Sequence, residues 1–254
     1  IVVNRAVLIR NILLFFFFIL IWNAILCKDN RHAKSSADFE KNNMVLGRYF
    51  SPDIKNEIEE TGLNFSEYVP KNLNVAVLFT DIVGFTKLSE KMEPNDVLEL
   101  LSEYQTIMVE CIFEFNGTVD KFIGDAVMAN FGTPKSYGND AQNAFDCAKK
   151  MKSMLHEWNK NRIDNRQKVI EHRIGIHYGE CIVGNVGGEK RVEYTVLGDT
   201  VNVASRLCDL SKIFNNDLLI SKALYDQIEI VEEYEELDSH PIKGRKEKID
   251  LIRV

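Results

Sequence analysis

Apolar residues recur along this chain in two different spacings, and the spacings predict strands and helices in alternation. Short apolar runs predict strands at Asn74–Thr80, Thr118–Ile123, Ala126–Phe131, Val169–Tyr178, Cys181–Val186 and Val192–Leu197. Apolar positions three and four residues apart predict helices at Pro94–Phe115, Asp140–Trp158 and Thr200–Leu210. Asp199 or Thr200 can cap the last of these helices.

Glycine-containing pairs mark where neighbouring strands connect. Gly124-Asp125 separates the second predicted strand from the third, and Gly179-Glu180 separates the fourth from the fifth, so each pair predicts a tight hairpin. The resulting order of strand, helix, strand, strand, helix and strand is that of a ferredoxin-like α+β fold. The other elements predict additional strands and helices around this βαββαβ core.

The N-terminal part of the chain has a different pattern. Ile12–Leu26 is an almost unbroken apolar run, slightly shorter than the about 20 residues that a membrane-spanning helix needs. A buried core helix and the apolar part of a secretory signal are alternatives, but no small-residue cleavage site follows. We therefore predict a transmembrane helix within residues 1–27. Because the chain begins with Ile1 rather than methionine, we expect this helix to end a longer membrane or sensor region.

Residues 28–73 are polar and mixed, and they predict a helical connector. Asp38–Phe50 and Asp53–Glu60 have the spacing of short amphipathic helices, and Pro52 suits the start of the second one. Residues 74–254 form the predicted main domain. Basic residues flank the apolar segment on both sides, so charge gives little preference for its orientation in a membrane.

Composition and charge narrow the range of partners. Of the 254 residues, 45% are hydrophobic and 27% are charged, as in an ordinary globular protein. The net charge of −7 argues against nucleic-acid binding through a broad basic face. The five cysteines form no CxxC pair, so neither a zinc site nor a disulfide framework has support. Scattered reduced thiols fit a cytosolic domain.

Two aspartates lie where an apolar run meets a glycine. Asp81 follows the first predicted strand, and Asp125 lies in the first predicted hairpin. In a ferredoxin-like order these strands are neighbours, so both carboxylates can approach the same end of the sheet. Two carboxylates there can hold a pair of divalent cations against a polyphosphate. Separately, Asp81 could be a helix cap and Asp125 a turn residue, so the hypothesis depends on both together.

Other polar positions give weaker signals. The turn Ile82–Thr86 leads from a strand toward a helix, where backbone N–H groups can cradle phosphate. Asn202 and Arg206 share one helix face and could contact a ribose and a phosphate, although a solvated polar face is the alternative. A lone strand lysine such as Lys121 is usually solvated. Gly184–Gly188 has neither a Rossmann nor a P-loop pattern, so we predict a hairpin turn there.

Four sequence blocks together resemble the signature of class III nucleotide cyclases, the catalytic domain of adenylate and guanylate cyclases. They are FTDIVGFT (79–86), DKFIGDAVMANFG (120–132), RIGIHYGE (173–180) and EYTVLGDTVNVASRL (193–207), and they occur in the family's order. The resemblance covers the chain from about Val75 to its end, and it implies that residues 74–254 are the catalytic domain. Upstream, LGRYFSPDI (46–54) resembles the helical segment that often precedes such domains in bacterial members.

The resemblance implies roles for single residues. By similarity, Asp81 and Asp125 bind two divalent metal ions, Mg²⁺ or Mn²⁺, with the adjacent Ile82 as a further metal contact. Lys121 and Thr195 match the two positions that select the base. Lysine with threonine or aspartate resembles the adenine-selecting pair, whereas guanine-selecting members tend to have glutamate and cysteine.

The same resemblance implies how the ribose and the phosphates are held. Asn202 matches the residue that orients the ribose, and Arg206 matches the residue that neutralises charge growing on the α-phosphate. Lys243 matches a lysine that reaches the terminal phosphates, and Arg191 is a further phosphate contact. For the turn after Asp81, the resemblance implies nucleotide contacts from Ile82, Gly84, Phe85 and Thr86.

The resemblance therefore implies an adenylate cyclase that converts ATP into 3′,5′-cyclic AMP and pyrophosphate. Members of the family form their active sites at a head-to-tail dimer interface, so we expect a homodimer with two equivalent sites. Because ATP is cytosolic, we expect a membrane-tethered enzyme whose catalytic domain is cytoplasmic. A guanylate cyclase, a catalytically silent nucleotide-binding or dimerisation module, and an RNA-binding domain are the alternatives, and the acidic charge opposes the last of them.

Overall fold

The computed structural model describes residues 51–61, 70–188, 191–214, 217–229, 234–241 and 248–254. Ser51 to Val254 form one compact unit. The expected transmembrane segment, the expected helix Asp38–Phe50 and Lys243 lie outside the described residues. Within the described ranges, no helix combines the length and the apolar character needed to cross a membrane.

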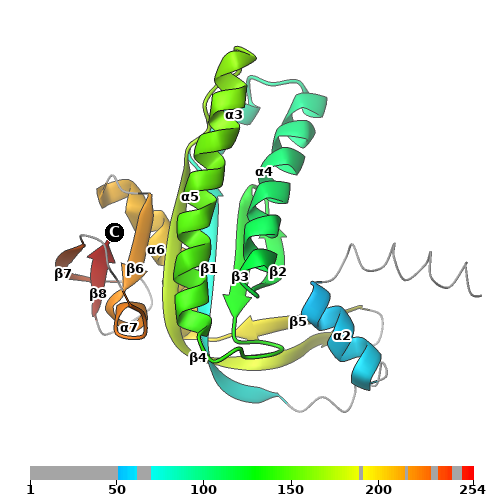
Figure 1. The fold of residues 1–254 in the computed structure, drawn as a ribbon, viewed down its shortest axis with the longest axis vertical. Coiled ribbons are helices and arrows are strands. Elements are labelled where there is room, and N and C mark those ends of the chain that lie inside the picture. The colour runs from blue at the N-terminus through cyan, green and yellow to red at the C-terminus, as the bar shows by residue number, and fades with distance from the viewer. Residues whose placement is uncertain (1–50, 62–69, 189–190, 215–216, 230–233, 242–247) are drawn as a thin grey trace, which may run out of the picture. The chain divides into compact units, whose positions relative to one another are not determined.

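The described chain alternates helices and strands (Figure 1). In order, the elements are α2 (Pro52–Thr61), β1 (Lys71–Ile82), α3 (Phe85–Ser89), α4 (Pro94–Glu114), β2 (Thr118–Ile123), β3 (Ala126–Phe131), α5 (Asp140–Asp164), β4 (His172–Gly188), β5 (Arg191–Leu197), α6 (Asp199–Phe214), β6 (Leu218–Ser221), α7 (Lys222–Tyr225), β7 (Glu235–Pro241) and β8 (Lys248–Arg253). The expected elements from β1 to α6 are present, apart from one hairpin. The helix expected at Asp53–Glu60 is confirmed as α2.

The strands form one eight-stranded sheet in the order β2-β3-β1-β4-β6-β8-β7, with β5 paired to β4. The four strands β2, β3, β1 and β4 are antiparallel to their neighbours, which confirms the ferredoxin-like order of the core. Strand β6 runs parallel to β4, while β8 and β7 continue the sheet with antiparallel pairing. The fold is therefore α+β, with the additional strands that the sequence led us to expect.

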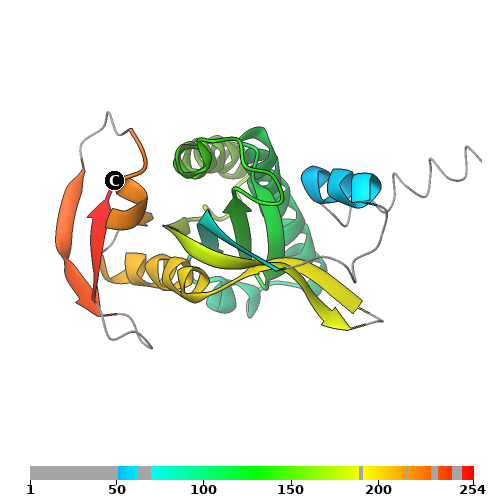
Figure 2. The same cartoon turned by 90° about the horizontal axis from the view of Figure 1, so that it is seen from below.

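Alternating side chains of β1 bury both faces of the sheet. Ala76 and Leu78 belong to the core that α4 and α5 cover, whereas Val75, Val77 and Phe79 belong to the core beneath α6. Figure 2 shows α4 and α5 on one face of the sheet and α6 on the other. A central strand that is buried on both faces can be continuously apolar, which explains the sequence of β1.

The hairpin expected at Gly179-Glu180 is wrong, because β4 continues through these residues as one strand of 17 residues. Gly179 pairs with Val75 and Glu180 with Asn74 of β1. A Cβ atom on Gly179 would lie 2.7 Å from Thr200 Oγ1, so this glycine marks a close approach of α6 rather than a turn.

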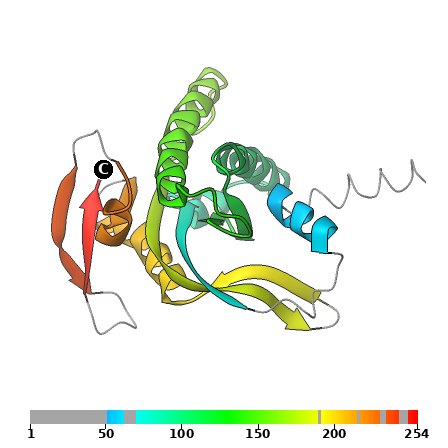
Figure 3. The same ribbon diagram turned by 60° about the horizontal axis from the view of Figure 1, so that its bottom comes forward.

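Two smaller expectations near this strand, the Thr200 cap and the hairpin turn at Gly184–Gly188, also change. The Thr200 hydroxyl does not serve as a helix cap, because it donates a hydrogen bond to the Glu180 carbonyl at 2.7 Å and so ties α6 to β4. Gly184–Gly188 is the last part of β4, and the connection to β5 follows it, since Gly188 pairs with Arg191. Figure 3 shows this end of β4 and β5 running out beyond α4 and α5.

Gly175 sets how closely α6 lies on the sheet. A Cβ atom at this position of β4 would lie 2.2 Å from the Cys208 amide nitrogen and 2.6 Å from the Ala204 carbonyl oxygen. Both of these are backbone atoms of α6, so they cannot move without moving the helix. The absence of a side chain at Gly175 therefore positions the whole of α6.

We expect Gly175→Ala to lower the free energy of unfolding by about 1–3 kcal/mol or more, because the added methyl group must displace α6. Urea denaturation measures this change. Gly188→Ala is the matched control, since a Cβ atom there meets nothing within 4 Å. Equal stability of the two variants would contradict the close packing of α6 on β4.

Candidate active site

Asp81 and Asp125 come together at one end of the sheet. Asp81 is the penultimate residue of β1, and Asp125 lies in the turn that joins β2 to β3. The amide of Ile82 donates a hydrogen bond to Asp125 Oδ2 at 3.2 Å, so the turn is tied to the end of β1. Gly124 adopts a φ of 66°, a conformation that favours glycine in this tight turn. The expected approach of the two carboxylates is confirmed.

Burial and the neighbouring Asp125 both disfavour the ionised form of Asp81. Burial raises the pKa of Asp81 to about 7, and its hydrogen bond with Asp125 and the negative charge of Asp125 act in the same direction. Lys212 acts in the opposite direction. Hard divalent cations prefer carboxylate oxygens, and a bound cation would favour the ionised form of Asp81. This pair of donors therefore fits the two divalent metal ions that the sequence resemblance implies.

The turn after β1 exposes backbone beside these carboxylates. Val83 donates a backbone hydrogen bond to Glu171 at 2.8 Å, which anchors the start of the turn. Gly84 is exposed, has a φ of 68° and precedes α3. Phe85 packs partly against the core, while Thr86 is exposed. The expected turn is present, with its exposed residues next to Asp81.

Lys121 and Thr195 meet through a residue that the sequence alone did not reveal. Lys121 lies on β2 and Thr195 on β5, and Asp120 contacts both of them. The Thr195 hydroxyl donates to Asp120 Oδ1 and Oδ2, each at 2.9 Å. Lys121 Nζ lies 3.4 Å from Asp120 Oδ1 and 3.1 Å from Glu193 Oε2. The available signal was a charged pair, Asp120-Lys121, within an otherwise apolar strand.

Asn202 and Arg206 lie on the face of α6 that points away from the sheet. Both residues are exposed, while Val203 and Leu207 are buried. The guanidinium of Arg206 donates a hydrogen bond to Asp209 at 3.1 Å on the same exposed surface. Both side chains are therefore accessible to a ligand or a second chain, as their helical spacing predicted.

A family model described as "Adenylate and Guanylate cyclase catalytic domain" matches residues 67–252. The chain belongs to this family.

Named relatives agree with the family assignment of this cyclase domain. Adenylate cyclase 1 of Rhizobium meliloti (strain 1021) is 32% identical over 217 residues, which cover 78% of this chain and 33% of that protein. Adenylate cyclase of Anabaena cylindrica is 36% identical over 232 residues, which cover 89% of this chain and 44% of that protein. The chain thus spans less than half the length of these relatives.

Solved structures share the fold of the cyclase domain. A bacterial light-regulated adenylyl cyclase has a TM-score of 0.75 and 26% identity, covering 87% of this chain and 63% of that one. The adenylyl cyclase CyaB from P. aeruginosa has a TM-score of 0.64 and 34% identity, covering 73% and 95%. The guanylyl cyclase Cya2 has a TM-score of 0.65 and 30% identity, covering 73% and 93%.

The remaining expected phosphate contacts of the cyclase domain are only partly described. Arg191 begins β5 with a highly exposed side chain that pairs with Glu193. It lies near Lys121, because Glu193 also pairs with Lys121. Lys243 falls within 242–247, outside the described residues.

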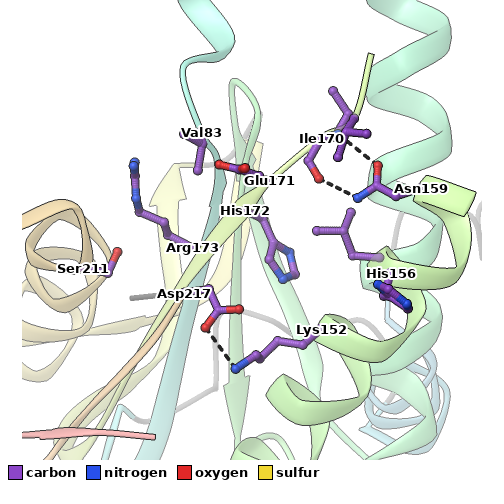
Figure 4. A pocket seen from close by; sticks show the side chains of 12 residues that line it. Val83, Lys152, His156, Asn159, Ile170, Glu171, His172, Arg173, Ser211 and Asp217 are labelled. Carbon is purple, nitrogen blue, oxygen red and sulfur yellow. Dashed lines mark hydrogen bonds and ion pairs between the residues drawn. The ribbon is translucent and has the colours of Figure 1, made fainter. Parts of the chain in front are cut away.

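A cavity of about 500 Å³ lies beside the turn that follows β1, because Val83 of this turn is part of its lining (Figure 4). Its lining comes mainly from α5 and the start of β4, and it includes a Lys152–Asp217 ion pair at 2.9 Å. Asn159 exchanges two hydrogen bonds with the backbone of Ile170 at its edge. Apart from Val83 of the expected phosphate-binding turn, none of the residues with predicted roles lines this cavity, although Arg173, which pairs with Asp81, does.

We expect Asp81→Asn to stabilise the metal-free protein at neutral pH. An acid with a raised pKa holds its proton more tightly in the folded state, so the wild type loses stability as the pH rises from about 4 toward about 7. The neutral amide removes this loss. Thermal unfolding in a chelator should therefore give a difference in Tm between variant and wild type that grows with pH.

Asp238→Asn, at an exposed position of β7, is the control and should show no such growth. Added Mg²⁺ should raise the Tm of the wild type more than that of Asp81→Asn. A difference in Tm that stays constant across this pH range would contradict the raised pKa of Asp81.

Proposed function

We propose that this chain is the catalytic part of an adenylate cyclase that converts ATP into 3′,5′-cyclic AMP and pyrophosphate. The main support is the cluster of Lys121, Asp120 and Thr195, which presents the lysine and threonine that match adenine selection. The two named relatives, from Rhizobium meliloti and Anabaena cylindrica, are both adenylate cyclases. A guanylate cyclase is the alternative, because the similar Cya2 structure is of a guanylyl cyclase.

Asp81 and Asp125 would hold two divalent metal ions, Mg²⁺ or Mn²⁺. Bound there, such ions supply positive charge to the triphosphate and lower the pKa of the ribose 3′-hydroxyl. The protein contributes two carboxylates whose positions are fixed by the end of β1 and by the β2–β3 turn. Exposed backbone at Gly84 and Thr86 would contact the phosphates beside them.

Asn202 and Arg206 would act on the reacting part of the nucleotide. The amide of Asn202 can orient the ribose, so that the 3′-oxygen faces the α-phosphorus. The guanidinium of Arg206 can neutralise the charge that grows on the α-phosphate oxygens. Both groups are exposed on α6, and Asp209 holds the Arg206 guanidinium at 3.1 Å. Arg206 would exchange this partner for the nucleotide on binding.

The proposed enzyme is a head-to-tail homodimer with two equivalent sites. Asp81 and Asp125 of one chain would face Lys121, Thr195 and the exposed face of α6 of the other. The exposure of Asn202 and Arg206 supports this arrangement, because catalytic groups that serve a partner must be accessible in the single chain. The segment 12–26 would tether the dimer to the inner or plasma membrane, with the catalytic domain in the cytoplasm where ATP is available.

The shared site can be tested by mixing two inactive variants. Asp81→Ala and Arg206→Ala should each be inactive as homodimers, because every site lacks one essential group. In the mixed heterodimer, one site carries both substitutions, whereas the other receives wild-type residues from both chains. Cyclic AMP formation should then recover to at most about half of the wild-type rate per heterodimer. Mixtures that stay inactive, despite heterodimers detected by differential tags, would exclude a site shared between chains.

Base selectivity tests the choice of ATP over GTP. The double variant Lys121→Glu and Thr195→Cys should use ATP less well and GTP better, because the hydrogen-bonding groups facing the base are exchanged. The ratio of kcat/KM for ATP and GTP measures the change. An unaltered ATP preference in the folded double variant would show that these two residues do not contact the base.

A further inference from the structure

One carboxylate lies behind the base-selecting pair without reaching solvent. The side chain of Asp120 is 0% exposed. Its oxygens accept hydrogen bonds from the Thr195 hydroxyl at 2.9 Å, the Val196 amide at 3.2 Å and the Asn130 side chain at 3.5 Å. Lys121 Nζ lies 3.4 Å away. A carboxylate offers about four acceptor positions, so these partners occupy Asp120 and leave it no direct contact with a nucleotide.

Asp120 fixes the direction in which the Thr195 hydroxyl can bond. Burial raises the pKa of Asp120, while the hydrogen bonds from Thr195 and Val196 and the charge of Lys121 act against this rise. The ionised carboxylate that these donors favour can only accept hydrogen bonds. A hydroxyl has one proton, and Thr195 directs it to Asp120. The Thr195 oxygen can therefore offer only its lone pairs to a ligand.

The same carboxylate helps to hold Lys121. The ammonium group has three protons, and it lies within reach of Asp120 Oδ1 at 3.4 Å and Glu193 Oε2 at 3.1 Å. A third proton is left for a ligand. The site thus combines one acceptor, the nearly buried Thr195, with one half-exposed donor, Lys121. Adenine has a donor at N6 and an acceptor at N1, whereas guanine has an acceptor at O6 and a donor at N1.

We propose that Asp120 is a positioning residue that sets the base selectivity of this site, by restricting the Thr195 hydroxyl to accept a hydrogen bond from the amino group of adenine. The proposal rests on the proposed function, since it takes Thr195 and Lys121 to be the groups that contact the base. It goes beyond that function, because it assigns the discrimination to a buried residue that does not touch the nucleotide.

Asp120→Asn in the full-length chain tests the proposal. The new amide can donate to the Thr195 oxygen, so the hydroxyl proton becomes free to turn toward O6 of guanine. We expect the ratio of kcat/KM for ATP to that for GTP to fall about tenfold or more. Asp250→Asn is the matched control, because Asp250 also accepts a hydrogen bond from a hydroxyl, that of Ser239, on β7 and β8. This control should leave the ratio unchanged.

A purely structural role for Asp120 predicts a different outcome. It would reduce the rates with ATP and GTP by the same factor, and the ratio would not change. The Thr195→Val background separates the two cases further, because it has no hydroxyl to orient. Asp120→Asn should change the ratio much less in this background than in the wild type. An equal change in both backgrounds would overturn the proposal.

Measurements on the wild type and on a second variant separate a failure of the proposed function from a failure of the Asp120 proposal. A wild type that prefers GTP, or makes no cyclic nucleotide, overturns both the proposed function and the role of Asp120. A wild type that prefers ATP, with a folded Asp120→Asn variant that keeps the same ratio, overturns the role of Asp120 alone. If thermal unfolding shows that Asp120→Asn is not folded, Asp120→Ser gives the same comparison, because a water molecule or the serine hydroxyl can then donate to Thr195.

Discussion

The pairing of β1 with β3 on one side and β4 on the other fixes the site. Thr80 pairs with Val127, which places the end of β1 beside the β2–β3 turn, and Asp81 pairs with Arg173 of β4. Both faces of β1 are buried, so a slip of one residue would exchange the side chains of its two faces. The core therefore holds Asp81 and Asp125 in register.

Strand β4 extends this control to the cluster of Asp120, Lys121 and Thr195. It pairs with β1 over twelve positions, from Lys71↔Val183 to Ile82↔His172, and its Gly184 pairs with Thr195 of β5. Its Gly175 also admits α6 close to the sheet, which places Asn202 and Arg206 on the outer surface. One strand thus links the two carboxylates, the cluster around Thr195 and the helix that carries Asn202 and Arg206.

Asp120 and Asp81 are both at least partly buried, but their carboxylates have opposite surroundings. Asp120 is satisfied within the chain by donors from β3 and β5 and by Lys121 of its own strand, so its position is rigid and it stabilises the arrangement around it. Burial and the neighbouring Asp125 raise the pKa of Asp81 to about 7. This raised pKa costs stability at neutral pH, as is common at functional sites.

The order of the helices and strands, and the candidate site residues, could be predicted from the local sequence. Short apolar runs predicted β2 and β3, and helical spacing predicted the start of α4, at their observed bounds. The blocks around Asp81, Asp125 and Asn202 predicted the family through their resemblance to its signature, which lies in the local sequence. The same local signals failed at Gly179-Glu180. A glycine that admits Thr200 of α6 has the same appearance in sequence as a glycine that makes a turn.

The contacts between residues far apart in the chain depend on tertiary packing. Asp120 and Thr195 are 75 residues apart, and only the packing of β5 near β2 brings the carboxylate to the hydroxyl. Gly175 acquires its role from Cys208 and Ala204 on α6, and no pattern in its own strand indicates this. Spacing along a chain shows which face of an element a side chain occupies. Which other element meets that face depends on how the sheet and its helices pack together.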